Sequence, residues 1–332
     1  MAPVIDFHSH ILEAEVARQA WDHNVASGFG TFPPNPRNNE ITGKMSDPAE
    51  HVADMDKRGI DVEIVSSSTV FANCEWADPR TDLALNQRLN DANAAAQQTY
   101  SGRVLGSITL PLQAPDLAVR ELQRADDELG LRVVNMPANV KGTYVGHPSL
   151  WPVWEAIAER DLVVFMHPHG VKDPWYLDYG LWNSIGQTVE EARALSSMIY
   201  EGLLDRLPTL KIVVSHGGGY LPHYCGRLDR NVHNMPHSAR NITRLPSEYL
   251  RDLYYDTCVY DPEVLTALVG RVGANRIVLG SDYPVGDPDP VGFIERCPGL
   301  TPEQATTIKS STATRLLGLA DQERSRLPNP DS

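Results

Sequence analysis

The sequence predicts an α/β fold, namely a (β/α)8 TIM barrel with long inserted loops at its C-terminal face. Short β-branched apolar runs alternate with longer amphipathic segments along the 332 residues, which is the order of strand and helix in repeating βα units. The apolar runs are nearly continuous and no hairpin turn signal splits them, which is typical of parallel strands covered on both faces. Eight such runs are present, the number of strands that closes this kind of barrel.

The predicted strands share a β-branched, almost uniformly apolar composition, and they cover residues 4–7, 62–65, 104–110, 133–136, 163–166, 212–214, 253–259 and 277–279. The predicted helices carry apolar residues at helical spacing and cover residues 48–58, 83–100, 116–129, 150–160, 189–206, 262–272 and 302–317. A chain of this length can hold two domains, but α/β barrels of about 250 residues and more are single domains. We therefore expect one domain over residues 1–320.

Two connections that follow predicted strands are unusually long, at residues 11–47 and 169–185. The first is rich in Gly and Pro and the second is rich in aromatic residues. Loops of this length are usually lids or binding loops, and the loops after strands form the reactive face of a barrel. A third insertion is expected at residues 231–249, and the charged tail at residues 321–332 is expected to be disordered.

The composition excludes several classes of partner. Twenty-nine Lys and Arg against 43 Asp and Glu give a net charge of −14, which argues against nucleic acid as a partner. No apolar run approaches the length of about 18 residues that a spanning helix needs, and residues 1–6 do not show the basic segment followed by an apolar one that is typical of a signal peptide. The four cysteines lie far apart without a CxxC pair, which fits neither a disulfide framework nor a thiolate zinc site. We expect a cytoplasmic protein with reduced thiols and no membrane partner.

Two histidines end the first predicted strand. His8 and His10 are two positions apart, so both side chains point to the same face. Two neutral imidazoles at this spacing suit a borderline divalent cation such as zinc. The triplet alone is weak evidence, because buried or surface histidines also occur by chance, but its place at the end of a strand favours a metal site.

Two further strand ends also carry histidine. His167 follows the fifth strand directly and is expected to be a third ligand, whereas His169 lies beyond a strand-ending proline and is expected to line the pocket. His216 follows the sixth strand and precedes three glycines, which allow the backbone to turn sharply and approach a ligand. His216 is a candidate general acid or base, and the alternative is an idle histidine in a glycine-rich turn.

The eighth strand ends at Asp282. Burial of an unpaired carboxylate is costly, so Asp282 needs a cation or several hydrogen-bond donors. A metal ion supplies that partner, and the carboxylate can also accept a proton from bound water. The alternative is that the sequence Asp-Tyr-Pro begins an ordinary turn. Four strand ends that all carry His or Asp together predict a metal site at the C-terminal face.

These motifs, in this order, resemble the amidohydrolase superfamily. They are His8-Ser9-His10, His167-Pro168, His216 with its three glycines, and the segment 280–284; the stretches 55–62 and 226–229 are similar as well. Within the superfamily they resemble the branch of metal-dependent decarboxylases typified by aminocarboxymuconate semialdehyde decarboxylase. The resemblance implies one zinc ion, or manganese as in some members, held by His8, His10, His167 and Asp282. It also implies that His216 is the catalytic histidine. The proton that the reaction needs is expected to come from His216, or from metal-bound water with Asp282.

The resemblance also implies how a substrate is held. Arg227 matches an arginine that reaches the site of a neighbouring subunit to bind a carboxylate, which implies a homodimer; an exposed helix arginine is the alternative. Arg37 is a candidate for a second carboxylate contact, because a guanidinium fork matches a carboxylate. Trp175 and Trp182 are expected to form an apolar, planar wall for an aromatic or conjugated acid, or else only to fix the loop to the barrel.

Three functions remain open from the sequence. The first is a metal-dependent, non-oxidative decarboxylase of an aromatic or muconate-type carboxylic acid, which needs a cation near the oxygen that receives charge and a proton donor near the carbon. The second is a metal-dependent hydrolase or hydratase, because metal-bound water can attack a lactone, an amide or a C–C bond. The third is a metal-binding barrel without catalysis. In the first two cases the partner is a small molecule.

Overall fold

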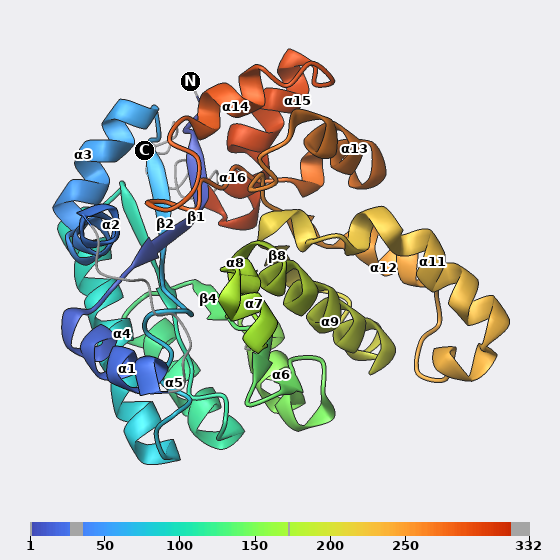
Figure 1. The fold of residues 1–332 in the computed structure, drawn as a ribbon, viewed down its shortest axis with the longest axis horizontal. Helices are drawn as coiled ribbons and strands as arrows, with labels where there is room; N and C mark the ends of the chain where they lie inside the picture. Colours follow the sequence, from blue (N-terminus) through green and yellow to red (C-terminus); the bar gives the residue numbers. More distant parts are fainter. Residues whose placement is uncertain (1, 27–35, 172, 320–332) are drawn as a thin grey trace, which may run out of the picture.

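The computed structural model describes residues 2–26, 36–171 and 173–319, and it contains a curled, parallel sheet surrounded by helices (Figure 1). Seven strands lie in the order β1-β2-β3-β4-β7-β8-β9, and every neighbouring pair is parallel. Their bounds are β1 Ile5–Ile11, β2 Val62–Ser67, β3 Val104–Ile108, β4 Val133–Met136, β7 Val163–Met166, β8 Lys211–Val214 and β9 Tyr254–Tyr255. The predicted α/β barrel class is confirmed.

Residues 277–279 do not form a regular strand, so the prediction of an eighth strand there is wrong. Ile277 forms a single parallel bridge with Tyr255, and Ser9 forms another with Tyr283. The amide of Phe7 donates to the carbonyl of Leu279 at 2.8 Å, so the segment lies between β9 and β1 and closes the sheet. The amide of Leu279 donates instead to the carbonyl of Ile308, in a helix, which interrupts the ladder. The sequence also failed to predict a short antiparallel pair, β5 Asn139–Val140 and β6 Thr143–Tyr144.

The predicted helices are present between the strands, with bounds that differ by a few residues. They are α3 Pro48–Arg58, α4 Pro79–Thr99, α5 Pro115–Asp127, α6 Trp151–Glu159, α9 Gly186–Tyr200, α10 Leu203–Arg206, α13 Pro262–Val272, α15 Pro302–Thr306 and α16 Thr312–Leu316. A π-helical turn at Thr307–Ser311 joins the last two. Asp47, Asp78 and Asp261 cap three of these helices, each followed by a proline whose fixed φ suits the first turn.

The inserted connections are largely helical. The segment 11–47 contains α1 Ala14–Ala26 and α2 Pro36–Ser46, and the segment 169–185 contains α7 Pro174–Asp178 and α8 Leu181–Ser184. Near the third insertion, α11 Leu221–Asn234 and α12 Pro246–Asp252 extend away from the sheet as an arm (Figure 1). A further short helix, α14 Pro290–Glu295, follows the closing segment. The predicted disordered tail at residues 321–332 lies outside the described residues.

Apolar side chains from the strands fill the interior of the curled sheet. Ile5, Ile64, Val133 and Phe165 belong to one buried cluster that also includes Leu316 of α16. A larger buried cluster packs between the strands and the surrounding helices. The region below the strand ends is therefore filled by apolar side chains. This low-dielectric surrounding strengthens electrostatic interactions among the polar groups above it.

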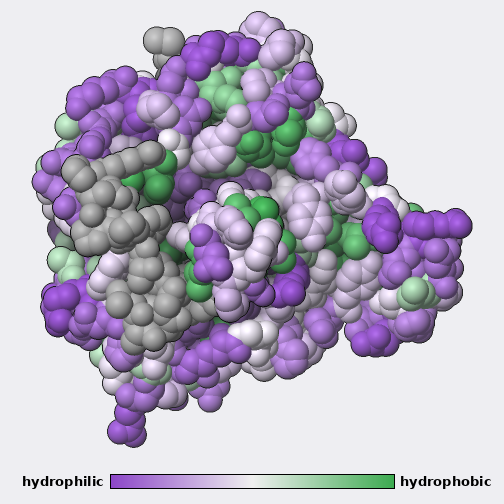
Figure 2. All heavy atoms as spheres, in the orientation of Figure 1, coloured by the Kyte–Doolittle hydropathy of each residue, from purple (hydrophilic) through white to green (hydrophobic). Residues whose placement is uncertain are grey.

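The face of the molecule shown in Figure 2 is mostly hydrophilic where described residues form it. Figure 2 shows purple side chains over most of the viewed face, with green hydrophobic side chains near its middle. Within the described part of the chain, no helix combines the length and hydropathy needed to cross a bilayer.

Candidate metal centre

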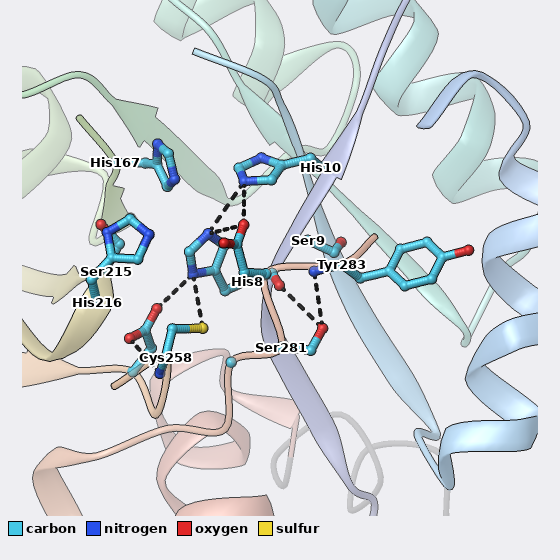
Figure 3. Close-up of polar contacts among 12 residues, drawn as sticks. His8, Ser9, His10, His167, Ser215, His216, Cys258, Ser281 and Tyr283 are labelled. Carbon is cyan, nitrogen blue, oxygen red and sulfur yellow. Dashed lines mark hydrogen bonds and ion pairs between the residues drawn. The ribbon is translucent and has the colours of Figure 1, made fainter. Parts of the chain in front are cut away.

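Four predicted ligands come together where their strands end. His8 and His10 lie on β1, His167 directly follows β7, and Asp282 lies in the segment that closes the sheet. One donor atom from each of these four residues lies within 4.8 Å of the others. The three histidines are at most 5% exposed, and their rings converge in Figure 3. A bulge in β1 between Asp6 and Ser9 shifts the strand's register next to His8.

The closest approach in this group is between nitrogen and carboxylate atoms. His10 Nε2 lies 2.9 Å from Asp282 Oδ1, and His8 Nε2 lies 3.3 Å from the same oxygen. The two Nε2 atoms are themselves 3.3 Å apart. His8 Nδ1 lies 2.6 Å from Asp256 Oδ2, so the carboxylate holds a proton on this nitrogen and directs Nε2 toward the group, where a metal that displaces the Nε2 proton would bind.

This donor set fits a divalent cation. Burial alone would lower the pKa of His8, but the carboxylates of Asp282 and Asp256 raise it to about 10, so the protein field favours positive charge at this point. Burial lowers the pKa of His10 and of His167, so these rings are neutral and offer lone pairs. Three imidazole nitrogens and one carboxylate oxygen are donors that both zinc and manganese accept.

Neighbouring side chains orient the ligands. The hydroxyl of Thr69, which follows β2, lies 2.9 Å from His167 Nδ1 and also contacts the carbonyl of Pro168. The Thr69 hydroxyl donates to the Pro168 carbonyl, so its oxygen can accept the Nδ1–H of His167, which leaves the lone pair of Nε2 for a metal. Asp256 accepts two backbone N–H bonds, from Gly217 and Cys258, in addition to its contact with His8. These bonds outweigh burial and lower the pKa of Asp256, which therefore remains ionised.

His216 lies beside the ligands with its own carboxylate. Its ring centroid is 5.1 Å from that of His167 and 5.3 Å from that of His8. His216 Nδ1 lies 2.6 Å from Glu191 Oε1, on helix α9, and the Ser215 hydroxyl donates to the same oxygen. Burial would lower the pKa of His216, but the Glu191 carboxylate raises it. His216 is thus placed to hold and deliver a proton next to the four ligand residues.

Two residues of the site have strained backbones. His216 has a φ of 48° and Asp282 a φ of 57°, in the left-handed region that non-glycine residues rarely adopt. Such conformations persist only where the surrounding structure fixes them, and they concentrate at functional sites. Gly217 also has positive φ, and a Cβ at this position would lie 2.5 Å from a methyl group of Val259, so the turn after His216 requires glycine.

The predicted substrate-binding residues are more dispersed. His169 is 8% exposed and contacts Asn73 at 3.0 Å, outside the group of four ligands. Trp182 of α8 is buried against Val70, whereas Trp175 of α7 is 55% exposed beside Tyr176. The two tryptophans lie on two separate short helices, Trp182 in a buried cluster and Trp175 largely exposed.

Of the two predicted arginines, Arg227 has a described side chain and is not among the grouped ligands. Arg227 is exposed on α11, in a groove that also includes Arg193 and Tyr224. Arg37 lies in α2, but its side chain is outside the described part of the chain.

Two carboxylates that matter to the site, Glu191 and Asp256, are not among the residues predicted from the sequence. Asp256 is the charged residue inside a predicted apolar strand, which is itself a signal for a functional carboxylate. Glu191 follows another glutamate in a helix, and the helical pattern does not decide which of the two points inward.

The barrel and its donor set define a protein with a buried centre for one divalent metal ion. A family model described as Amidohydrolase matches residues 5–319, so the chain belongs to the amidohydrolase family. The chain is 30% identical over 326 residues to 2-amino-3-carboxymuconate-6-semialdehyde decarboxylase of Dictyostelium discoideum, covering 95% of this chain and 89% of that protein. It is 24% identical to a 2-keto-4-carboxy-3-hexenedioate hydratase of Sphingobium, covering 85% and 83% of the two chains.

Solved structures of decarboxylases share the fold. The structure of 5-carboxyvanillate decarboxylase from Sphingomonas paucimobilis superposes with a TM-score of 0.85 at 26% identity, covering 95% of this chain and 99% of that chain. A dihydroxybenzoic acid decarboxylase from Polaromonas, solved with manganese and the inhibitor 2-nitroresorcinol, has a TM-score of 0.81 at 23% identity and covers 98% and 100%. The resemblance inferred from the motifs is confirmed at the level of the family.

Proposed function

We propose that this protein is a metal-dependent, non-oxidative decarboxylase of an aromatic or muconate-type carboxylic acid. The observation that carries the proposal is the juxtaposition of a three-histidine, one-aspartate donor set with the His216–Glu191 pair. The similarity to decarboxylases across nearly the whole chain supports the same reaction. We propose zinc as the metal, with manganese as the alternative, because both accept this donor set.

The reaction replaces the carboxylate of the acid by a proton and releases CO2. When bound, the metal supplies positive charge that stabilises a developing negative charge on the substrate. The side chains of His8, His10, His167 and Asp282 hold that charge in place. His216 stores the proton that the substrate carbon needs, and Glu191 orients the ring and favours its protonated form. Asp282 provides a second group that can exchange a proton with water.

The predicted substrate residues complete the proposal. His169 and Trp182 are buried close to the strand ends, and Arg37 and Trp175 lie on segments inserted after strands, where reactants bind in barrels. We further propose that the barrel is one domain over residues 1–320 and that the protein acts in the cytoplasm. The free cysteines support a reducing compartment.

A direct assay tests the decarboxylase proposal. Purified protein is loaded with zinc or manganese and incubated with 5-carboxyvanillate, 2,6-dihydroxybenzoate or 2-amino-3-carboxymuconate semialdehyde, and released CO2 is measured. Metal-stripped protein is the control. Metal-dependent CO2 release supports the proposal. If metal-loaded protein hydrates 2-keto-4-carboxy-3-hexenedioate without releasing CO2, the hydratase alternative is correct, and this second candidate is favoured by the similarity to the Sphingobium enzyme. If the protein binds metal but turns over no acid, ester or lactone, it is a metal-binding barrel without catalysis, and the decarboxylase proposal is wrong.

We propose that Arg227 acts across a homodimer, in the site of the other subunit. Its exposed position on the projecting arm, away from the four ligands of its own chain, supports this role. Mixing two inactive variants, Arg227→Ala and His216→Ala, is the sharpest test. A mixed dimer contains one site with both an intact His216 and an intact partner arginine, so mixing restores activity. An Arg227→Ala protein that is fully active, or activity that mixing fails to restore, contradicts the proposal.

A further inference from the structure

A buried cluster of charged side chains lies behind the metal centre. Arg58 ends helix α3, and its side chain is 7% exposed between the fully buried carboxylates of Asp6 and Glu63. Arg58 Nη2 lies 2.9 Å from Glu63 Oε1, and Nη1 lies 3.4 Å from Asp6 Oδ2. The guanidinium therefore compensates two carboxylates that would otherwise face each other in the interior.

Asp6 connects this cluster to the backbone of the ligand-bearing segments. Asp6 Oδ1 accepts the amide N–H of His8 at 3.1 Å and that of Ser281 at 3.0 Å. The Ser281 hydroxyl donates to the other oxygen of Asp6 and accepts a bond from Arg58 Nη1 at 3.1 Å. The residue before Asp282 is thus held by both charged groups. Figure 3 shows Ser281 beside the strand that carries His8.

The residue after Asp282 is held by the same arginine. The guanidinium carbon of Arg58 lies 4.1 Å from the centre of the Tyr283 ring, a cation–π arrangement. The Tyr283 hydroxyl donates to Asp54 Oδ2 at 2.8 Å, and the Tyr283 amide donates to the Ser281 hydroxyl at 3.2 Å. The carbonyl of Tyr283 accepts the amide of His10 at 2.8 Å, which ties this residue to the second histidine of β1.

Asp282 itself needs such support. Its φ of 57° is unfavourable for an aspartate, and its amide donates to the carbonyl of His8 at 2.9 Å. A residue in this conformation relaxes toward ordinary φ values unless its neighbours prevent it. Both chain neighbours of Asp282 contact Arg58, so the arginine restrains the strained residue from two sides.

We propose that Arg58 is a positioning residue for the metal centre. Acting through Asp6, Ser281 and Tyr283, it fixes the Asp282 carboxylate against His8 and His10 in the geometry that binds the metal. This inference rests on the proposed metal site, but it concerns metal affinity rather than the reaction. A residue that only stabilised the fold would change the melting temperature and leave the affinity of the folded protein for metal unchanged.

The test compares Arg58→Met with Arg58→Lys and with the control Arg124→Met. Arg124 also forms a fork with a fully buried carboxylate, that of Glu121, at 2.9 and 2.8 Å, but it lies on α5. Zinc affinity is measured by competition with a chelating dye on metal-free protein whose fold is checked by circular dichroism. Arg58→Met is expected to weaken zinc binding about 10- to 100-fold, as loss of groups that support metal ligands does. The zinc affinity of Arg58→Lys is expected to lie between those of the wild-type protein and Arg58→Met. Arg124→Met is expected to bind zinc as the wild-type protein does, even though its melting temperature falls.

A second variant keeps the test decisive if Arg58→Met does not fold. Ser281→Ala preserves every charge in the cluster and removes only the hydroxyl that joins Asp6, Arg58 and Tyr283. It is expected to weaken zinc binding in the same direction and to change the visible spectrum of the cobalt(II)-loaded protein, which reports ligand geometry. Wild-type zinc affinity in a folded Arg58→Met protein, or in Ser281→Ala when the former does not fold, overturns the inference. If the wild-type protein binds no metal, the proposed function fails instead.

Discussion

Two histidine–carboxylate pairs lie side by side in the barrel, and they differ in what surrounds them. His8 with Asp256 and His216 with Glu191 have the same Nδ1 to oxygen distance of 2.6 Å. Burial would raise the pKa of Asp256, but its hydrogen bond with His8, the charges of His8 and His216 and a backbone bond from Gly217 lower it. Burial raises the pKa of Glu191, whose second oxygen has no partner among the described residues. The first pair directs Nε2 of His8 toward the candidate metal site, whereas the second pair is suited to sharing a proton between His216 and Glu191.

The environment of the other ring nitrogen completes this contrast. His8 Nε2 faces Asp282 and His10, the donor atoms of the candidate metal centre. His216 lies beside that centre but is not one of the four grouped ligands. The same local pair can therefore serve metal binding in one place and proton transfer in the other. Substitutions that affect metal content and turnover separately test this distinction.

The largest expected effect is that of Asp282→Ala. This change removes the carboxylate that both His8 and His10 approach, and it leaves His8 with Asp256 as its remaining carboxylate partner. We expect the purified variant to lose bound metal and all turnover, measured by elemental analysis and CO2 release. Asp127→Ala, which alters a surface ion pair, is the matched control and should retain both. A fully active Asp282→Ala protein would rule out a ligand role for Asp282.

The next largest effect is expected from His216→Ala. Removal of a general acid typically slows a reaction by about 10²- to 10⁴-fold. Because His216 is not among the four grouped ligands, metal content should stay at the wild-type level. Elemental analysis and kcat measured on the same sample decide the point. Loss of metal together with activity would show that His216 belongs to the metal centre.

Asp256→Asn should act on the first pair alone. The substitution keeps the size of the side chain but removes the charge that holds the proton on His8 Nδ1. Changes to such supporting groups commonly weaken metal binding by about 10- to 100-fold. With metal in excess, kcat should recover most of its wild-type value. An unchanged dissociation constant would mean that the other ligands orient His8 without Asp256.

Glu191→Gln is the counterpart in the second pair. The neutral amide can still contact His216, but it no longer favours the protonated ring. We expect kcat to fall by about 10-fold, less than the about 10²- to 10⁴-fold expected for loss of the general acid itself because the His216 ring remains, with metal affinity unchanged. A drop in metal content with normal kcat per bound metal would reverse the roles assigned to the two pairs.

The sequence predicted the group of ligand residues because a parallel barrel brings the carboxyl ends of its strands to one face. His8, His10, His167 and Asp282 each follow an apolar run, so topology alone placed them together. Helices 48–58 and 262–272 have the bounds that their apolar spacing predicted, and in the structure an Asp cap followed by a proline begins each of them.

The remaining features depend on contacts between distant segments. The amide of Leu279 donates to a helix rather than to a strand, and no local pattern indicates this. Trp175 is exposed on α7, a helix of five residues with no buried side chain, and a helix this short has too few residues for a periodic pattern to show which side faces solvent. The choice of Glu191 as the partner of His216 requires the position of α9 relative to β8, which periodicity does not specify.

The smallest expected effect is a change in the number of protons released when metal binds. It tests whether Asp282 and Asp256 together hold a proton on His8 before the metal arrives. Without metal, His8 has a pKa raised to about 10 by Asp282 and Asp256 against the effect of burial, so it is protonated at neutral pH. Metal must displace that proton, and the apparent affinity should therefore rise about tenfold for each unit of increasing pH up to that value. One proton should be released per metal ion bound at pH 8, measurable with a pH indicator in weak buffer. Asp256→Asn removes one of the two carboxylates, so its proton release at pH 8 should be smaller. Equal release by both proteins would show that Asp282 alone sets the charge of His8.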